Sequence, residues 1–517
     1  MLMQTRILSA TTIGIDACLI DVEVDLSMGL LQFNIVGLPD VAIKESRQRI
    51  ITALKNCGIR LPERKITVNL APADVKKEGA LFDLPIALGV LHAAHEVPIA
   101  AAFLAETLFV GELSLDGSIR PIRGMLPIAR GAHKRGIRRL MVPQANAAEA
   151  AYVKDLEVFG FAHITELVAH IRGDRTVAQT VSSLSQEESR IGELLDYADV
   201  VGQNQAKRAL QIAAAGRHNI LFIGSPGSGK TMLAQRLASI MPRMSFEEML
   251  DVSTVFSVSG KLGSESFICQ RSFRSPHHTI SAAGLVGGGS FPQPGEISLA
   301  HHGVLFLDEF VEFRRSVIEL LRQPLESKEI SIARAQQSIT FPASFLLIAA
   351  LNPCPCGYRG DPIKKCICTD VQVKRYLERL SGPLLDRIDL QVAVQPVTYR
   401  DVAGGAKVRQ EKTSEDLRVG VERAVALQQE RFNGRLWWNA WMSKKEIDTY
   451  CILTEPAKIV IEKAFQSLAL SMRGYHKLLK ISRTIADLDG VEYIDKNHVQ
   501  EAILYRSLES YLEKIRG

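Results

Sequence analysis

Short apolar runs and amphipathic stretches alternate along the first 172 residues of the chain. Runs rich in β-branched and aromatic residues predict strands, and apolar positions that recur every three or four residues predict helices. The predicted strands are residues 33–36, 65–70, 107–111 and 139–143, and the predicted helices are residues 41–57 and 84–94. Residues 174–192 are polar and lack this periodicity, which is typical of a linker.

The alternation resumes from residue 194 to about residue 395, where a helix, a strand, a glycine-rich loop and a second helix precede two further apolar strands. The remainder is mostly helical, with heptad-like apolar spacing in residues 417–429 and 481–488. This order predicts an α/β protein whose second domain contains a parallel sheet. We expect four parts: an α/β domain over residues 1–172, a linker over 173–193, an α/β core over 194–395 and a helical subdomain over 396–517.

The composition is that of a folded protein. At about 150 residues per domain, 517 residues give roughly three folded units. Contents of 46% hydrophobic and 23% charged residues exclude a mainly disordered or collagen-like chain. No apolar run approaches the ~20 residues that span a bilayer, and the first residues lack a signal-peptide pattern, so we expect a cytoplasmic protein without membrane partners. The net charge of +5 is compatible with a polyanionic partner without establishing one.

The sharpest motif is GSPGSGKT at residues 224–231, which matches G-x-x-x-x-G-K-[ST]. It follows a predicted strand at 219–223 and precedes a predicted helix at 232–240, a context that argues against a chance glycine-rich turn. Such a loop wraps backbone N–H groups around phosphates, the lysine reaches the β- and γ-phosphates, and the hydroxyl binds Mg²⁺. The predicted ATP-binding residues are Gly224, Ser225, Pro226, Gly227, Ser228, Gly229, Lys230 and Thr231.

Two further predicted strands end in polar residues. The apolar run at 303–307 is followed by Asp308, which suits the Mg²⁺ side of the site, and by Glu309, which suits the base that orients the attacking water. The strand at 344–350 leads to Asn352, which can hold that water and sense the γ-phosphate. A turn-forming asparagine before a proline is the competing interpretation of Asn352.

Phosphoryl transfer gains most from a cation at the developing charge, often an arginine from a neighbouring subunit. Arg387, downstream of the third strand, and Arg473, in the helical region, are the two candidates. Spacing alone does not distinguish either of them from a surface or salt-bridged arginine.

Four stretches make the chain recognisable. They are SFRSPHHTI at residues 272–280, PGEISLAHHG at 294–303, NPCPCG at 352–357 and SGPLLDRID at 381–389. With them the chain resembles the magnesium-chelatase-like branch of the AAA+ ATPases, and it resembles the ComM/YifB family over nearly its whole length. In that resemblance Asn352 matches sensor 1, Arg387 the trans-acting arginine finger and Arg473 the sensor 2 arginine. The resemblance implies a ring-shaped homo-hexamer with active sites between subunits, whereas the residues alone indicate only a P-loop ATPase.

The N-terminal stretch GELSLDGSIRPIRG at 111–124 resembles the proteolytic domain of Lon, which uses a serine nucleophile and a lysine base. The segment that should carry the serine reads KEGALFD at 77–83, and the segment that should carry the lysine reads MLPI at 125–128. Because both partners are missing, we expect a catalytically inactive domain that serves as a scaffold, an assembly platform or a DNA-engaging collar.

Cysteine and histidine clusters raise the question of a metal. Four cysteines form C-x-C-x₉-C-x-C after the third core strand: Cys354, Cys356, Cys366 and Cys368. They suit a structural Zn²⁺ site, although C-x-C departs from the usual C-x₂-C, and reduced loop thiols or one adventitious pair remain alternatives. The histidine pairs 277–278 and 301–302 are expected to point in different directions and to be structural or interface residues.

The DNA-binding prediction depends on the family. Residues 328–340 predict a β-hairpin of the kind that related ring helicases project into the pore, with Arg334 near its tip facing a phosphate backbone. Considered alone, Arg334 is better explained as an exposed charge on a solvated hairpin, and only six copies around a ring would bring these charges together on one strand. Residues 284–295, rich in Gly and Pro, suit a second pore loop.

The family resemblance implies an ATP- and Mg²⁺-dependent DNA helicase that drives branch migration. Its partners would be single-stranded and branched DNA, together with recombination proteins, during natural transformation. The alternatives are a magnesium-chelatase-like motor and a protein-remodelling ATPase without a DNA substrate.

Overall fold

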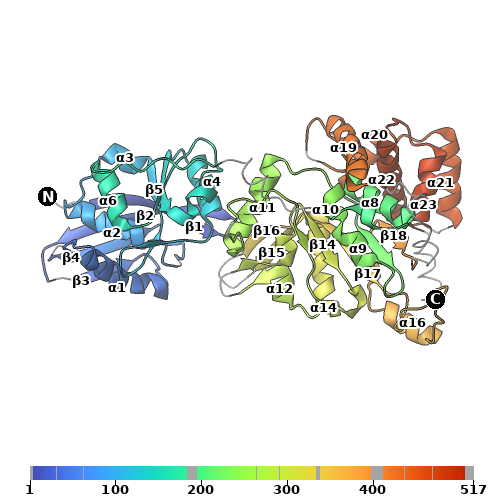
Figure 1. Ribbon diagram of the computed structural model, residues 1–517, viewed down its shortest axis with the longest axis horizontal. Helices are drawn as coiled ribbons and strands as arrows, with labels where there is room; N and C mark the ends of the chain where they lie inside the picture. The colour runs from blue at the N-terminus through green and yellow to red at the C-terminus, as the bar shows by residue number, and fades with distance from the viewer. Residues whose placement is uncertain are drawn as a thin grey trace. The chain divides into compact units, whose positions relative to one another are not determined.

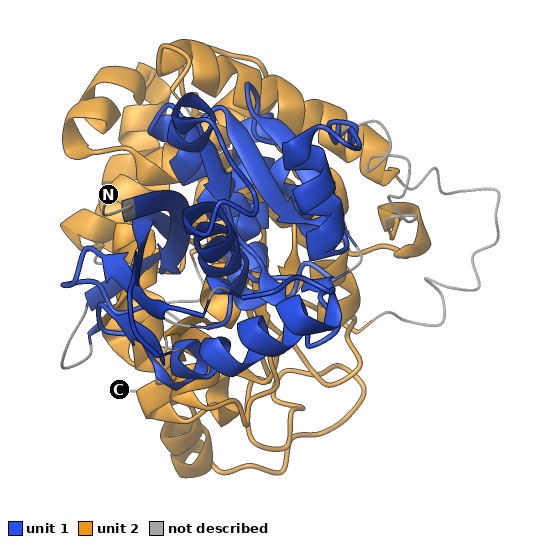
Figure 2. Ribbon diagram, turned by 90° about the vertical axis from the view of Figure 1, so that its left-hand side faces the viewer, with its two compact units in different colours: residues 1–191, 246–269, 333–341 blue, residues 192–245, 270–332, 342–517 orange. Residues whose placement is uncertain are grey.

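The computed structural model describes residues 4–30, 32–61, 63–77, 79–182, 195–263, 265–289, 292–333, 338–396, 412–435, 437–467 and 470–506. The chain forms two compact units (Figure 2). The first comprises Met1–Ile191, Phe246–Cys269 and Ala333–Phe341, and the second comprises Gly192–Ser245, Gln270–Ile332 and Pro342–Gly517. Two short segments that follow residue 245 in the sequence therefore fold with the first unit.

The first unit is built on a seven-stranded sheet with the order β3-β4-β2-β1-β5-β8-β9. Its strands are β1 (Gln4–Ile13), β2 (Asp16–Ser27), β3 (Gln32–Val36), β4 (Lys65–Ala71), β5 (Thr107–Phe109), β8 (Arg139–Pro143) and β9 (Glu157–Phe161). The strands β1 to β5 of this sheet are labelled in Figure 1. β2 is antiparallel to both β1 and β4, whereas β5 is parallel to β1, and β8 and β9 continue in parallel. Buried and less buried residues alternate along β2 and β4, as a sheet with one face on the core requires. A small separate ribbon pairs β6 (Glu112–Leu113) with β7 (Ile119–Arg120).

Helices complete the first unit. They are α1 (Val41–Asn56), α2 (Asp83–Ala93), α3 (Ala101–Ala105), α4 (Met125–Lys134), α5 (Gln144–Ala150), α6 (Ile164–Arg172) and α11 (Phe246–Ser259). α2 is buried on nearly all sides, and its Gly89 allows close packing on the sheet, because a Cβ there would lie 2.7 Å from Val24 Cγ2. α11 joins this unit through α4: Arg130 Nη1 lies 2.9 Å from Asp251 Oδ1, and the Ser257 carbonyl accepts from Gly124 N at 3.2 Å.

The second unit contains a five-stranded parallel sheet with the order β11-β14-β17-β10-β18. Its strands are β10 (Ile220–Ile223), β11 (Phe273–Arg274), β14 (Val304–Leu307), β17 (Leu346–Leu351) and β18 (Leu390–Ala393). Every residue of β10, β14 and β17 is buried, which is typical of parallel strands covered on both faces. Because parallel strands end at one edge, the polar residues that follow β10, β14 and β17 gather there.

Helices and short ribbons surround this sheet. The helices before the C-terminal region are α8 (Asn204–Gly216), α9 (Lys230–Gln235), α10 (Leu237–Ile240), α12 (Ala282–Val286), α13 (Glu296–Leu299), α14 (Arg315–Ile318), α15 (Arg322–Ser327), α16 (Asp370–Leu377) and α17 (Gly382–Leu385). One two-stranded ribbon pairs β12 (Gly287–Gly288) with β13 (Gln293–Pro294). A second ribbon pairs β15 (Glu329–Ala333) with β16 (Ser338–Pro342), and its segment Ala333–Phe341 is assigned to the first unit. The predicted hairpin is therefore present, but Arg334 lies outside the described residues.

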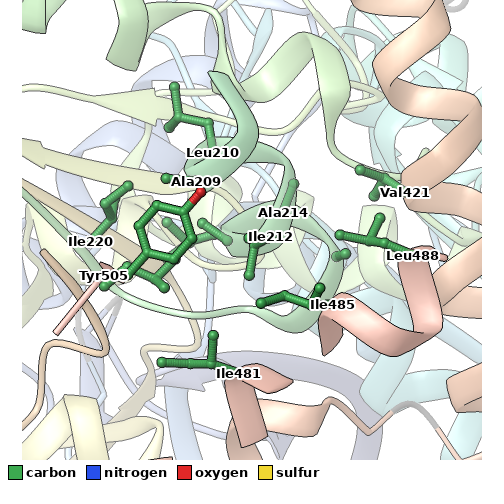
Figure 3. Packing of buried hydrophobic residues seen from close by; sticks show 14 of the residues in the cluster. Ala209, Leu210, Ile212, Ala214, Ile220, Val421, Ile481, Ile485, Leu488 and Tyr505 are labelled. Atoms are coloured by element: carbon green, nitrogen blue, oxygen red, sulfur yellow. The ribbon is translucent and has the colours of Figure 1, made fainter. Parts of the chain in front are cut away.

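The C-terminal region is helical. Its helices are α19 (Ser414–Arg431), α20 (Lys444–Tyr450), α21 (Glu455–Ser467), α22 (Met472–Leu488) and α23 (Lys496–Leu504). Apolar residues of α19 and α22, among them Val421 and Ile485, share one core with α8, as Figure 3 shows. The Tyr505 carbonyl also accepts from Gln391 N of β18 at 2.8 Å, so these helices are attached to the sheet. No helix among the described residues is long and apolar enough to cross a membrane.

One predicted helix is divided in two. The pattern indicates a single helix at 232–240, whereas α9 ends at Gln235 and α10 begins at Leu237. The Arg236 guanidinium donates to Met232 O at 3.1 Å, the oxygen that the Arg236 amide would use in a continuous helix, and also to Asp196 O at 2.6 Å. The local contact with Met232 and the tertiary contact with Asp196 together explain the break.

Candidate nucleotide site

The loop between β10 and α9 needs glycine for two different reasons. Gly227 and Gly229 have φ angles of 78° and 92°, which side-chain-bearing residues rarely adopt. Gly224 needs space instead, because a Cβ there would lie 2.2 Å from Val394 O. Ser228 Oγ is buried in the same loop without a hydrogen-bond partner among the described residues. The loop therefore has the tight backbone that brings N–H groups close to a phosphate.

Lys230, the first residue of α9, connects the loop to the end of β17. Its ammonium donates to Gly224 O at 2.7 Å, to Ser225 O at 3.0 Å and to Asn352 Oδ1 at 3.2 Å, which uses all three of its donors. Burial lowers the pKa of Lys230, while the charges of Asp308 and Glu309 act in the opposite direction. Lys230 and Asn352, predicted from separate motifs, thus lie in contact.

Thr231 and Asp308 bring a hydroxyl and a carboxylate together beside the phosphate loop. Thr231 Oγ1 donates to Asp308 Oδ2 at 2.8 Å, and Asp308 Oδ1 accepts from the Glu309 amide at 2.9 Å. A hydroxyl and a carboxylate beside a phosphate-binding loop are the hard oxygen ligands that Mg²⁺ prefers, so the residues present fit this ion.

Glu309 follows β14 in a strained backbone conformation. Its φ and ψ are 49° and 45°, in the left-handed region that non-glycine residues seldom occupy. Its carboxylate oxygen Oε2 lies 3.2 Å from Nδ1 of His278, and the His278 ring meets Phe313 edge-on at a centroid distance of 6.4 Å. His278 is predicted from the sequence only as a structural or interface residue, and no sequence pattern connects it with Glu309. The available signal was its position just after β11, the strand that neighbours β14 in the sheet.

The histidine pairs also differ from expectation in their orientation. The prediction that adjacent rings point in different directions is wrong, because the centroids of His277 and His278 lie 4.1 Å apart and those of His301 and His302 lie 3.9 Å apart. Burial is the largest cause that lowers the pKa of His302, to about 3, and the positive charges of Arg217 and Arg271 add to it. His302 is therefore neutral at ordinary pH.

Arg387 and Arg473 lie on a different pocket, of about 290 Å³. No residue of the phosphate loop is among the described residues that line it. Arg387 forms an ion pair with Glu326, and its buried Nε has no hydrogen-bond partner in the described part of the chain. The lysines and arginines that line the pocket are Arg217, Lys328, Arg387, Lys444, Arg473, Lys477 and Lys480. The structure brings both predicted arginines together, but not with Lys230 or Glu309 of the same chain.

Asp389, one of the acids that line this pocket, is held ionised. Burial alone would raise the pKa of Asp389, but Lys477 Nζ at 3.3 Å and His218 Nδ1 at 3.4 Å lower it well below its usual range. The pocket as a whole keeps an excess of positive charge and is suited to an anion.

The four predicted cysteine ligands lie together in the loop after β17. Their sulfur atoms all lie within 4.8 Å of one another, and Cys354 is buried while the other three are half-buried.

The two segments that in Lon would carry catalytic residues have structural roles. Lys77 is fully buried and donates to Pro72 O, and Asp83 forms a buried ion pair with Arg49 at 2.7 Å. After Gly124, the chain enters α4, whose Leu126 amide donates to Glu149 Oε1 at 3.0 Å. Neither segment presents a serine or lysine to the other.

Three family models of magnesium chelatase match the chain. The family "Magnesium chelatase, subunit ChlI" matches residues 196–402, "Subunit ChlI of Mg-chelatase" matches residues 22–146, and "Magnesium chelatase, subunit ChlI C-terminal" matches residues 411–506.

Individual proteins extend this similarity. The chain is 43% identical to Competence protein ComM of Haemophilus influenzae over 510 residues, which covers 98% of each chain. It is 40% identical to the uncharacterized protein YifB of Escherichia coli over 506 residues, 97% of this chain and 96% of that one. Lon protease 2 of Bacillus subtilis is 26% identical over 114 residues, 22% of this chain and 19% of the protease. With the parallel sheet and the C-terminal helices, these similarities confirm the predicted fold class.

Proposed function

The chain belongs to the ComM/YifB family of magnesium-chelatase-like AAA+ proteins, and from this membership we propose that it is an ATP-driven motor that promotes branch migration of DNA. Family membership suggests an ATPase, and the contact between Lys230, Asn352 and the loop carbonyls is the observation that carries the assignment of the site. The proposal adds the DNA substrate, the hexameric ring and a role in recombining incoming DNA during natural transformation.

In the proposed reaction, the backbone of the phosphate loop and Lys230 hold the β- and γ-phosphates of ATP. Lys230 would exchange some of its present acceptors for phosphate oxygens, and burial would strengthen that charge interaction. Thr231 and Asp308 would hold Mg²⁺, which neutralises developing phosphate charge when it is bound. Glu309 would orient the attacking water, and Asn352 would contact the γ-phosphate from the end of β17.

The arginines support a ring. Arg387 and Arg473 share a cationic pocket that contains no phosphate-loop residue among its described lining. Hydrolysis gains orders of magnitude from an arginine at the transferring phosphoryl group. A ring in which this pocket faces the phosphate loop of the neighbouring subunit would supply that arginine to every site.

The DNA substrate is proposed from the relatives. Identity to Competence protein ComM extends over 98% of both chains, so the likeness covers both units rather than the ATPase core alone. The net charge of +5 agrees with a polyanionic substrate. The contact predicted for Arg334 falls outside the described residues and stays a prediction.

The deciding experiment is ATP-dependent migration of a labelled four-way DNA junction by the purified full-length protein. Glu309→Gln is the matched control, because it removes the charge of the proposed base and keeps the size of the side chain. We expect migration by the wild type and none by Glu309→Gln. ATP hydrolysis without migration and without stimulation by DNA would contradict the DNA motor.

The match to magnesium chelatase families over three segments favours one alternative, a motor for metal insertion. It predicts that the chain, mixed with porphyrin-binding partner subunits and ATP, inserts Mg²⁺ into a porphyrin. Porphyrin metallation in place of junction migration would establish that alternative. Nucleotide-dependent capture of a protein partner, with neither of these activities, would favour protein remodelling.

A further inference from the structure

The loop between β17 and α16 holds its four cysteines at the spacing of a single metal ion. The Sγ atom of Cys354 lies 3.4 Å from that of Cys356 and 3.7 Å from that of Cys366, and the sulfurs of Cys356 and Cys366 lie 3.6 Å apart. In a tetrahedral site with Zn–S bonds of about 2.3 Å, the sulfurs are about 3.8 Å apart. A disulfide would require about 2.05 Å, so the four sulfurs are arranged for a shared ion rather than for two bonds.

Backbone amides point at two of these sulfurs. Cys356 N donates to Cys368 Sγ at 3.4 Å, and Cys368 N donates to Cys366 Sγ at 3.4 Å. Amide donors of this kind orient thiolate ligands and stabilise their negative charge. The spacing C-x-C, unusual for zinc, here lets the amide of the second cysteine in each pair reach a sulfur of the group.

The same loop has no regular secondary structure and is otherwise held by local polar contacts, such as the hydrogen bond from Lys364 N to Asp361 Oδ1 and the ion pair of Arg359 with Asp370. Residues 352–369 are all described and form no helix or strand. Their larger apolar side chains face solvent, with Ile363 72% and Ile367 85% exposed. Loops of this length without secondary structure are uncommon in compact domains, because no buried surface offsets the entropy of ordering them.

The loop also packs on the phosphate loop. Asn352, its first residue, accepts a hydrogen bond from Lys230 at 3.2 Å. Gly357, one residue after Cys356, approaches the phosphate loop so closely that a Cβ there would lie 2.6 Å from Pro226 Cδ. Cys354 and Cys356 therefore lie within two residues of Asn352 and Gly357, the two residues of this loop that approach the nucleotide site.

We propose that Cys354, Cys356, Cys366 and Cys368 bind a structural Zn²⁺ ion that holds this loop against the phosphate loop and keeps Asn352 in place. Four protein sulfurs fill the tetrahedron and leave no open position, so the ion is structural and not a second catalytic centre. Lys364 and Lys365 precede Cys366 and offset the net negative charge of four thiolates around one divalent cation. Metal binding is independent of the proposed function, whereas the effect on nucleotide turnover rests on it.

The first test measures metal in the full-length protein purified under reducing conditions. We expect about one zinc per chain in the wild type and in the control Cys57→Ser, whose cysteine lies in the first unit. The double variant Cys366→Ser/Cys368→Ser should retain less than about a tenth of that zinc. Replacing zinc by Co²⁺ should give the charge-transfer and ligand-field bands of a tetrahedral tetrathiolate. Wild-type protein that contains no zinc and shows no such spectrum with Co²⁺ would overturn the site.

The second test removes the ion reversibly from wild-type protein with a thiol-directed mercurial and a chelator, so that a variant that fails to fold does not decide the outcome. We expect kcat for ATP to fall about tenfold, which corresponds to the loss of one ordered contact at the phosphates, and to return when reductant and Zn²⁺ are added. An equal kcat before and after removal would overturn the coupling. Zinc-loaded protein without ATPase activity would instead contradict the proposed function and leave the metal site standing.

Discussion

Glu309 owes its position to two features that local sequence patterns do not encode. Its backbone is left-handed, and its carboxylate contacts His278, a residue from the segment after β11. A side chain that is 56% exposed and has a strained backbone needs such a partner to keep one orientation. We therefore regard His278 as a positioning residue for the proposed base.

Replacing His278 tests this role. His278→Ala should lower kcat for ATP about tenfold with less than a twofold change in KM, because orientation of the water is impaired and phosphate binding is not. His278→Asn, which keeps a donor near Glu309, should restore most of the rate. His133→Ala, at an exposed histidine of the first unit, is the control and should behave as wild type. An unchanged kcat in His278→Ala would leave His278 with a packing role only.

Lys328 provides a test of charge burial. Burial, together with Arg217 and Lys480, lowers the pKa of Lys328 to about 8, against the opposing effect of Asp389. Between pH 8 and about 10.4 the unfolded chain binds more protons at this position than the folded chain does. The free energy of unfolding should therefore rise with pH in this window, by about 1–3 kcal/mol, and the contribution should be constant below pH 8.

Urea unfolding followed by tryptophan fluorescence can measure this rise. All three tryptophans lie between residues 437 and 441, and Lys328 Nζ lies 5.3 Å from the ring centroid of Trp441. The quantity to compare is the slope of stability against pH in the wild type and in Lys328→Met, since other groups titrate equally in both. Identical slopes from pH 8 to pH 10 would show that Lys328 carries its usual pKa.

At the scale of elements, a buried ionic network joins α19 to α22. Asp487 is fully buried, and it lies 2.9 Å from Arg431 Nη1, 3.0 Å from Arg483 Nε and 2.7 Å from Asn439 Nδ2. Two guanidinium groups thus share one carboxylate. Removing one member of such a network leaves buried charge without compensation.

Asp487→Asn should destabilise the second unit by about 3–5 kcal/mol, which would be measured as a lower urea midpoint by tryptophan fluorescence. Glu462→Gln on α21 is the matched control, because Glu462 is exposed and its removal should change the midpoint little. A midpoint for Asp487→Asn equal to that of the control would mean that the network contributes no net stability.

Some features of the strands and helices can be predicted from local sequence patterns, and others cannot. β10, β14 and β17 are short, continuously apolar and followed by polar motifs, so their existence and the gathering of Lys230, Asp308 and Asn352 at one edge follow from sequence. The break at Arg236 and the contact of His278 with Glu309 do not, because each depends on a partner distant in the chain.

The unit to which α11 belongs is likewise not encoded in its local sequence, because it depends on partners distant in the chain. Its residues lie between the phosphate-loop helix and β11 in sequence, yet they fold with the first unit through Arg130 and Gly124. An apolar helix face indicates that a helix is buried and does not say against which unit.

At the scale of the whole molecule, the separation of Arg387 from the phosphate loop predicts an active site shared between subunits. Arg387→Ala should abolish ATP hydrolysis while ATP binding is kept, because it removes the cation at the transferring phosphoryl group. Glu309→Gln should also abolish hydrolysis and keep binding, because it removes the base that orients the attacking water. In a ring assembled from equal amounts of both variants, about one interface in four combines an intact Glu309 with an intact Arg387 from the adjacent subunit. We therefore expect hydrolysis to return to roughly a quarter of the wild-type rate on mixing, whereas each variant alone stays inactive.

If Arg387 acted on the ATP of its own chain, no mixture could contain a complete site. A mixture as inactive as its components, with mixed rings verified by differently tagged subunits, would contradict the shared site.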